Sequence, residues 1–146
     1  MARLLLVEDR DLRKQLLVST VEMLFDTIDW VDSSEEALEK LKMADATGQL
    51  YECLILDLNI WDFKGGTDGG RRISDERSPH HGIKVLEACI AAYKERLIIL
   101  SAYVSEVQTQ LTALGSLELV MPYPVPSNLL RERVQEILAR AARTAQ

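Results

Sequence analysis

The sequence predicts an α/β fold: a doubly wound sheet of five parallel strands with five helices on its two faces. Short apolar runs alternate with longer segments of helical period, and the runs are almost continuously apolar, which is typical of strands buried on both sides. A length of 146 residues suits one domain. We therefore interpret residues 1–146 as a single domain in which right-handed crossovers connect successive strands.

The five expected strands are short and rich in aliphatic side chains. Each is bounded by polar residues or turn signals, as strands in a compact α/β domain usually are. The expected strands are Arg3–Val7, Thr27–Val31, Cys53–Leu56, Leu97–Leu100 and Leu119–Met121.

The five expected helices each show an apolar stripe at helical spacing. The clearest start is the capping box formed by Ser33 and Glu36, and Gly48 lies just past the end of that helix. Ser127 is the expected N-cap of the last helix. In chain order, the stripes are Leu12, Leu16, Val21, Leu24 and Phe25; Ala37, Leu38, Leu41 and Ala44; Ile83, Leu86, Cys89 or Ile90, and Tyr93; Val104, Val107, Leu111 and Leu114; and Leu130, Val134, Ile137, Leu138 and Ala141.

A polar segment, residues 62–82, interrupts this alternation directly after the third strand. Its 21 residues include five of the seven glycines of the chain, and only Phe63 and Ile73 are large and apolar. A loop of this length is uncommon inside a compact domain and usually has a function or lacks order. We expect an inserted flexible loop.

Composition excludes several classes of protein. The net charge of −6 provides no basic excess for nucleic acid or for an anionic membrane. The apolar run near the start is too short for a membrane span or a signal peptide. Cys53 and Cys89 lie in apolar stretches, which favours buried free thiols over a disulfide framework. We expect a cytoplasmic protein without direct nucleic-acid binding or membrane insertion.

Chemically active side chains follow the ends of several expected strands. Glu8 and Asp9 follow the first strand, Asp57 follows the third, and Ser101 follows the fourth. Ligands of open parallel sheets bind outside the carboxyl ends of the strands, so we expect these side chains to converge there. Clustered carboxylates raise one another's pKa unless a cation neutralises them, and oxygen donors suit Mg²⁺. A carboxylate beside Mg²⁺ can attack phosphorus.

Five stretches in this order make the chain resemble a known family, the receiver domains of two-component response regulators. The stretches are RLLLVEDR, LILDLN, HHGIKVLEACI, IILSA and VMPYP. The resemblance covers the chain apart from Asp62–His81, and it is to an atypical single-domain receiver similar to the chemotaxis type. It implies the strand order 2-1-3-4-5 and a role in a phosphorelay.

The resemblance also implies roles for single residues. Asp57 matches the aspartate that is phosphorylated, and Glu8 and Asp9 match the acidic pair that holds Mg²⁺ together with it. Asn59 matches the position whose main-chain carbonyl completes the metal site. Gly82 matches a family glycine, but it comes 25 residues after Asp57, where the family has a short loop.

The switch residues behind this pocket match the family only in part. Ser101 matches the switch hydroxyl, and Ala102 matches the small residue after it. Met121 stands where the family has a lysine, and a thioether offers no charged donor to a phosphoryl group. Glu118 stands where the family usually has an aromatic switch residue.

Side chains of the insertion offer two hypotheses. Lys64, Arg71 and Arg72 are candidates to fold over the pocket and replace the missing lysine, because cationic side chains, arginine above all, bind phosphate. His80 and His81 suggest a transition metal, but no further ligand follows at a suitable spacing. We favour a polar loop for these histidines.

We expect a stand-alone receiver that accepts a phosphoryl group on Asp57 with Mg²⁺ and signals by protein–protein contact. Phosphorylation would shift a population between two surface states. Such a protein is a switch with at most slow self-dephosphorylation, not a turnover enzyme. The expected partners are a sensor histidine kinase or phosphotransfer protein, a downstream protein target, and a second copy in a homodimer.

Three alternatives stay open at this point. A degenerate receiver would act as a phosphorylation-independent interaction module, and Met121 and Glu118 favour this reading. A phosphohydrolase of the haloacid-dehalogenase type would need a second aspartate two residues after the first, where this chain has Asn59. A DNA-binding domain would need a basic patch and a recognition helix, and the sequence shows neither.

Overall fold

The structure is a computed structural model that describes residues 2–63, 67–68, 71–72, 77–121 and 123–144. The strands are β1 (Arg3–Val7), β2 (Thr27–Val31), β3 (Cys53–Asp57), β4 (Thr67–Asp68), β5 (Arg71–Arg72), β6 (Leu97–Leu100) and β7 (Val120–Met121). The α-helices are α1 (Asp11–Val21), α2 (Ser34–Thr47), α3 (Pro79–Tyr93), α4 (Val104–Ala113) and α5 (Ser127–Thr144). Short 3₁₀ turns are η1 (Glu22–Leu24), η2 (Lys94–Arg96) and η3 (Leu117–Leu119).

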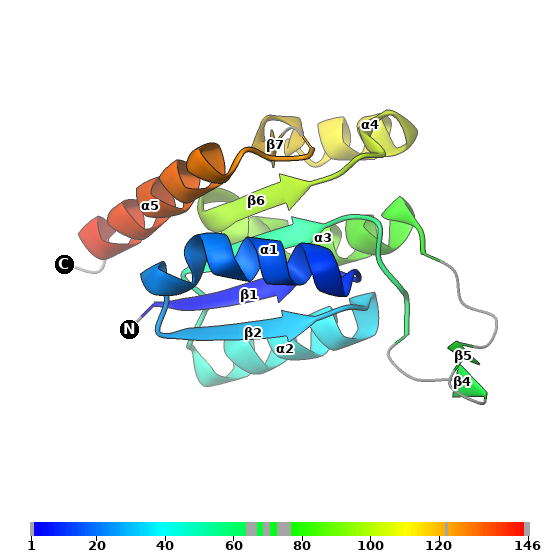
Figure 1. Ribbon diagram of the computed structural model, residues 1–146, viewed down its shortest axis with the longest axis horizontal. Coiled ribbons are helices and arrows are strands. Elements are labelled where there is room, and N and C mark those ends of the chain that lie inside the picture. The colour runs from blue at the N-terminus through cyan, green and yellow to red at the C-terminus, as the bar shows by residue number, and fades with distance from the viewer. Residues whose placement is uncertain (1, 64–66, 69–70, 73–76, 122, 145–146) are drawn as a thin grey trace.

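The main sheet is parallel, with the spatial order β2-β1-β3-β6-β7 (Figure 1). Counted along the strands of this sheet, the order is 2-1-3-4-5, which confirms the expectation. Helices α2, α3 and α4 cover one face, and α1 and α5 cover the other. In the part of the chain that the structure describes, no helix has the length and apolarity needed to cross a bilayer.

The core consists of two apolar layers, one on each face of the sheet. Successive side chains of β1 alternate between them: Leu5 and Val7 pack toward α2 and α3, whereas Leu4 and Leu6 pack toward α1 and α5. All four are fully buried. This two-sided burial is the reason that the strands read as continuous apolar runs.

The predicted cap of α2 is confirmed. The Ser33 hydroxyl accepts a hydrogen bond from the Glu36 N–H at 3.2 Å, which satisfies one free donor of the first turn. Gly48 ends the helix in the left-handed region, with φ at 69°.

The predicted apolar stripe of α1 is wrong at its start. Leu12 and Leu16 are 77% and 69% exposed, whereas Leu17 and Val21 are buried against the sheet. The inner face of α1 therefore follows Leu17 and Val21, four residues apart. The chain then enters the 3₁₀ turn η1, which does not have the period of an α-helix. The apolar residues from η1 onward therefore pack on the core without continuing the spacing of α1.

Two predicted boundaries also shift. The Leu119 N–H donates to the Ser116 carbonyl at 2.9 Å and closes a turn, so Leu119 belongs to η3 and β7 starts one residue later than expected. Ser127 is the first helical residue of α5 rather than its N-cap, because the turn already closes from the Leu130 N–H to the Pro126 carbonyl at 3.1 Å.

The described residues of the insertion contain regular secondary structure, where the sequence predicted a flexible loop. Strands β4 and β5 pair antiparallel and project away from the main sheet (Figure 1). Helix α3 begins at Pro79, within the expected loop, because the Ser78 hydroxyl accepts the His80 N–H at 3.1 Å and proline suits the first helical position.

Both ends of the insertion are tied to the body of the domain. At its start, the Ser34 N–H of α2 donates to the Trp61 carbonyl at 2.8 Å, and Lys84 of α3 lies 2.7 Å from Asp62. At its end, the Ser78 N–H donates to the Ile60 carbonyl at 3.1 Å. The two ends therefore lie side by side next to the carboxyl end of β3.

We predict that the native protein is unreactive toward thiol reagents. Cys53 and Cys89 are buried and free, and burial raises the pKa of each thiol to about 12. Neither thiol forms the reactive thiolate at pH 8. Mass spectrometry after iodoacetamide treatment should show no adduct on the native protein and two adducts in urea. Labelling of either cysteine in the native protein would contradict the buried placement.

Candidate functional site

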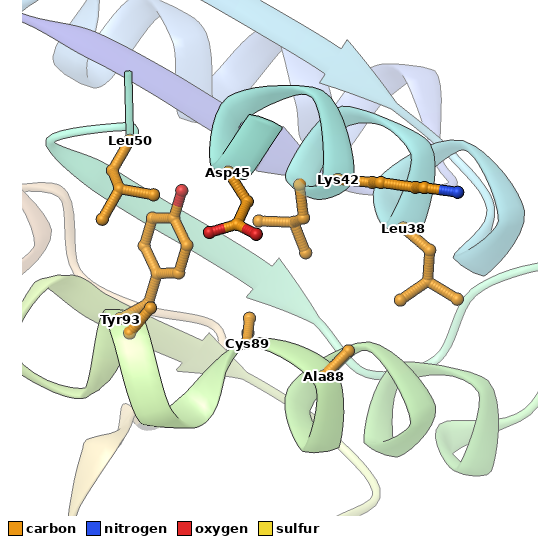
Figure 2. Close-up of a pocket in the computed structure, with 9 residues that line it drawn as sticks. Leu38, Lys42, Asp45, Leu50, Ala88, Cys89 and Tyr93 are labelled. Carbon is orange, nitrogen blue, oxygen red and sulfur yellow. The ribbon is translucent and has the colours of Figure 1, made fainter. Parts of the chain in front are cut away.

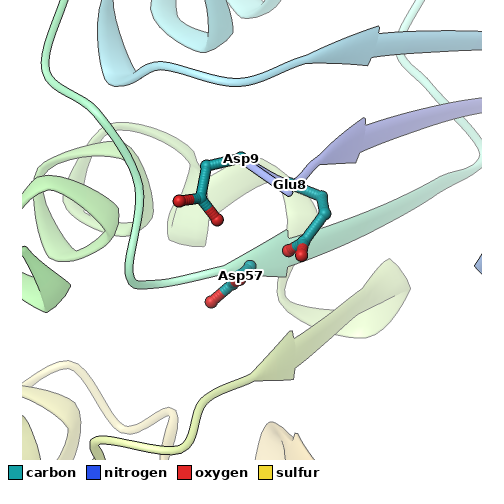
Figure 3. Close-up of side chains that lie close together, drawn as sticks. All are labelled: Glu8, Asp9 and Asp57. Atoms are coloured by element: carbon teal, nitrogen blue, oxygen red, sulfur yellow. The ribbon is translucent and has the colours of Figure 1, made fainter. Parts of the chain in front are cut away.

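Three carboxylates converge at the carboxyl edge of the sheet, as the sequence predicted. Glu8 and Asp9 follow β1, and Asp57 ends β3 (Figure 3). One oxygen of each lies within 4.8 Å of the others. Glu8 and Asp57 are buried, and the side chain of Asp9 is only 1% exposed. A shared edge of two neighbouring parallel strands is what brings residues 49 positions apart together.

Main-chain hydrogen bonds hold these carboxylates in place. The Glu8 N–H donates to the Val31 carbonyl at 3.0 Å, and the Glu8 carbonyl accepts from the Trp30 indole N–H at 2.8 Å. The Asn59 N–H donates to Asp57 Oδ1 at 3.0 Å. The chain after β3 therefore turns back toward Asp57, with Asn59 beside the cluster.

The electrostatics of the cluster favour a bound cation. Burial raises the pKa of Glu8, and a hydrogen bond to Asp57 and the neighbouring negative charges raise it further. Burial also raises the pKa of Asp9, and Arg77 opposes this effect. Within the described residues, Glu8 Oε1 and Asp9 Oδ1 are buried without a hydrogen-bond partner, whereas Asp9 Oδ2 has an ion pair with Arg77. Clustered carboxylate oxygens with unused lone pairs fit Mg²⁺.

In the described part of the chain, two arginines contact this cluster, and the sequence pattern singled out neither as a site residue. Arg13 Nη1 lies 3.4 Å from Asp57 Oδ2, and its guanidinium lies 4.1 Å from the centre of the Tyr123 ring. Arg77 Nε lies 2.5 Å from Asp9 Oδ2 as an ion pair. Arg13 is partly buried, with 25% of its side chain exposed, whereas Arg77 is exposed, with 36% of its side chain accessible to solvent.

The helical period of α1 explains why Arg13 lies near the carboxylates. It precedes Leu17 by one turn and Val21 by two, so it belongs to the inner face of α1 at the end nearest the carboxylates. This signal was present in the sequence, but Leu12 and Leu16 are also one helical turn apart and suggested a different inner face.

The pairing of the two ends of the insertion explains why Arg77 lies near Asp9. The antiparallel bridge between Ile60 and Ser78 sets the adjacent residues Trp61 and Arg77 beside each other, and the guanidinium lies 4.7 Å from the centre of a Trp61 ring. From there it reaches Asp9. Nothing in the local sequence distinguishes this arginine from the others in the insertion. Of the predicted loop contributors, Lys64 lies outside the described residues, as do the side chains of Arg71 and Arg72.

The residues that were predicted to lie around the phosphorylation pocket have different surroundings in the structure. The Ser101 hydroxyl, at the end of β6, accepts the Tyr103 N–H at 3.0 Å, and Ala102 beside it is exposed. Met121 ends β7 opposite Leu100 and packs into the apolar layer under α1 and α5. Glu118 is exposed on η3 and not in a strand.

The two histidines of the insertion and the pocket in Figure 2 lie outside this site. His81 Nδ1 lies 2.9 Å from the Ile60 carbonyl, and in the described part of the chain the group of carboxylates is the one cluster suited to a metal. The pocket holds about 300 Å³ between α2 and α3, and its lining includes Leu38, Cys89 and Tyr93 but none of the three carboxylates.

Comparison with known proteins shows which solved structures share this fold. No protein-family model and no curated protein sequence matches the chain. A CheY-like response regulator receiver domain protein from Methanospirillum hungatei JF-1 superposes with a TM-score of 0.71 at 16% identity, over 99% of this chain and 98% of that one. The non-phosphorylated HemR receiver domain from Leptospira biflexa has a TM-score of 0.63 at 19% identity, over 95% of each chain.

A receiver domain protein from Clostridium thermocellum agrees, with a TM-score of 0.65 at 15% identity over 97% of this chain and 98% of that one. The protein is thus of the doubly wound α/β class with an acidic cluster at the carboxyl edge of its sheet. Within that class, its fold is that of response regulator receiver domains.

Proposed function

We propose that this protein is a response regulator receiver that accepts a phosphoryl group on Asp57 with Mg²⁺ bound and signals by protein–protein contact. The observation that carries the proposal is the buried cluster of Glu8, Asp9 and Asp57 on a receiver fold. A kinase or phosphotransfer protein would be the donor, and a downstream protein or a second copy would bind the altered surface.

The residues at the site suit this chemistry. An oxygen of Asp57 forms a bond to phosphorus while the bond between phosphorus and the donor breaks, and the electron pair leaves with the donor. Asp57 acts as a nucleophile only as the carboxylate, and the Asn59 N–H at 3.0 Å holds that carboxylate in place. Glu8, Asp9 and Asp57, with the Asn59 carbonyl, would hold Mg²⁺. When bound, the ion neutralises charge on the carboxylates and on the phosphoryl oxygens.

We predict that acetyl phosphate with Mg²⁺ adds one phosphoryl group to the wild-type protein and none to the Asp57→Asn variant. The amide of asparagine is not a nucleophile toward phosphorus at neutral pH. Intact-mass spectrometry measures the adduct. Removal of Mg²⁺ with EDTA should abolish it, because the three carboxylates would then repel the anionic donor.

Asp11→Asn is the matched control, since Asp11 is an exposed carboxylate two residues from Asp9. This variant should be phosphorylated like the wild type. An adduct on Asp57→Asn would place the acceptor elsewhere. A folded wild type without an adduct would favour the second candidate, a phosphorylation-independent interaction module.

The placement of Met121 favours that second candidate. Its thioether packs in the apolar layer beside Leu100 and offers no charge to a phosphoryl group. In such a module, partner binding would be the same for the wild type and for Asp57→Asn.

A further inference from the structure

Arg13 lies close enough to Asp57, the proposed phosphoacceptor, for its positive charge to act on this residue. It lies on the inner face of α1, in line with the buried Leu17 and Val21. Those two side chains pack on the sheet, and Arg13, one turn nearer the helix start, reaches the carboxyl edge instead. Within the described residues, it forms the ion pair with Asp57.

The guanidinium is held from several sides. Nη1 lies 3.4 Å from Asp57 Oδ2, and Nε lies 3.9 Å from Glu8 Oε1. The Tyr123 ring supports it at 4.1 Å, which is the geometry of a cation–π contact. Packing of this kind orients the flat guanidinium without consuming its donors.

The contact with Asp57 is loose enough to leave donors free. A single approach at 3.4 Å is near the long limit of a hydrogen bond and is not the two-pronged pairing that arginine forms with carboxylates. A guanidinium has five N–H donors in a fixed fork that matches phosphate oxygens. Arg13 therefore has both the charge and the spare donors that a phosphoryl group on Asp57 would require.

Phosphorylation would create a need for such a cation. It replaces the single negative charge of Asp57 with about two negative charges and adds three acceptor oxygens. Met121, at the end of β7, cannot supply a charged donor. Arg77 pairs with Asp9 instead of Asp57.

We propose that Arg13, seated on Tyr123, is the side chain that binds the phosphoryl group on Asp57. This inference rests on the proposed function. Arg13 contributes positive charge and N–H donors only. Tyr123 acts as a positioning residue, since its ring touches the guanidinium and not the reacting atoms.

The test compares the wild type with Arg13→Met, Arg13→Lys and Tyr123→Leu. Two quantities are measured: the rate of phosphorylation by acetyl phosphate with Mg²⁺, and the affinity for beryllofluoride with Mg²⁺. Beryllofluoride binds carboxylates as an analogue of a phosphoryl group. The affinity for Mg²⁺ alone, by calorimetry, shows whether the carboxylate cluster is intact.

Arg13→Met should lower the beryllofluoride affinity and the phosphorylation rate about tenfold or more, the usual effect of losing one charged hydrogen bond. Its affinity for Mg²⁺ alone should be equal or higher, because a competing cation has gone. Arg13→Lys should restore part of the loss. Tyr123→Leu should fall between Arg13→Met and the wild type.

Lys14→Met is the matched control. Lys14 is the next residue of α1, and its Nζ lies 4.7 Å from the centre of a Trp30 ring, so this variant also loses a cation and a cation–π contact. It should behave like the wild type.

Equal beryllofluoride affinity and equal phosphorylation in the wild type and Arg13→Met would overturn the inference while leaving the proposed function intact. A loss in Lys14→Met as large as in Arg13→Met would overturn it as well, because any cation on α1 would then suffice. A wild type that accepts no phosphoryl group would overturn both proposals together.

Discussion

Replacing Gly82 with alanine should destabilise the protein by about 3 kcal/mol or more, because overpacking against backbone that cannot move is costly. A Cβ atom at Gly82 would lie 2.2 Å from Leu58 Cα and 2.4 Å from the Leu58 carbonyl oxygen. The Gly82 N–H donates to that same carbonyl at 3.0 Å, so α3 and the segment after β3 are held together at this point.

Helix propensity alone predicts the opposite sign. Gly82 lies inside α3, where alanine is favoured over glycine by about 1 kcal/mol. The steric clash with the Leu58 backbone must exceed this gain. The free energy of unfolding, from urea titration followed by circular dichroism, measures the net effect.

Gly48→Ala is the control that separates backbone strain from the clash. Gly48 has φ at 69°, and a Cβ atom there would meet nothing within 4 Å. That variant should lose about 1 kcal/mol, the cost of a left-handed conformation alone. Equal losses at Gly48 and Gly82 would show that the close approach to Leu58 does not decide the role of Gly82.

Replacing Arg77 with alanine should have the second-largest effect, and its sign should depend on Mg²⁺. In EDTA, the variant should be less stable than the wild type by about 1–2 kcal/mol, because Asp9 loses its ion-pair partner. The figure is below that of a fully buried pair, since 36% of the Arg77 side chain is exposed to solvent.

The affinity for Mg²⁺ should rise about tenfold in the same variant. Arg77 and Mg²⁺ compete for Asp9, because the guanidinium already pairs with one of its oxygens and its positive charge repels a second cation. The insertion would thereby adjust how readily the site fills, because the bridge between Ile60 and Ser78 fixes Arg77 beside Trp61.

Isothermal titration with Mg²⁺ and urea unfolding in EDTA measure the two effects. Arg10→Ala serves as the control, since Arg10 is an exposed cation next to Asp9 in the chain, without an ion pair to it among the described contacts. It should change both quantities much less. The same Mg²⁺ affinity in Arg77→Ala and the wild type would mean that the ion pair does not compete with metal binding.

The fold class and the acidic cluster could both be predicted without a structure. Strands buried on both faces need continuous apolar runs, and a parallel sheet brings the ends of β1 and β3 to one edge, so Glu8, Asp9 and Asp57 were predictable from position alone. The capping box at Ser33 was predictable as well, because it depends on residues three positions apart.

Packing between distant segments sets which cations reach that cluster and where α3 meets the backbone after β3. Arg13 reaches Asp57 across 44 positions because Leu17 and Val21, not Leu12 and Leu16, face the sheet. The two faces of α1 are similarly apolar, so the choice between them depends on packing with the sheet and α5 and not on local pattern.

Arg77 and Gly82 owe their roles to the same long-range packing. One reaches Asp9 through the pairing of the two ends of the insertion, and the other meets Leu58 where α3 crosses the chain after β3. Periodicity and capping act over a few residues, whereas these contacts join segments distant in the chain. Their geometry therefore exists only once the sheet and its helices have assembled.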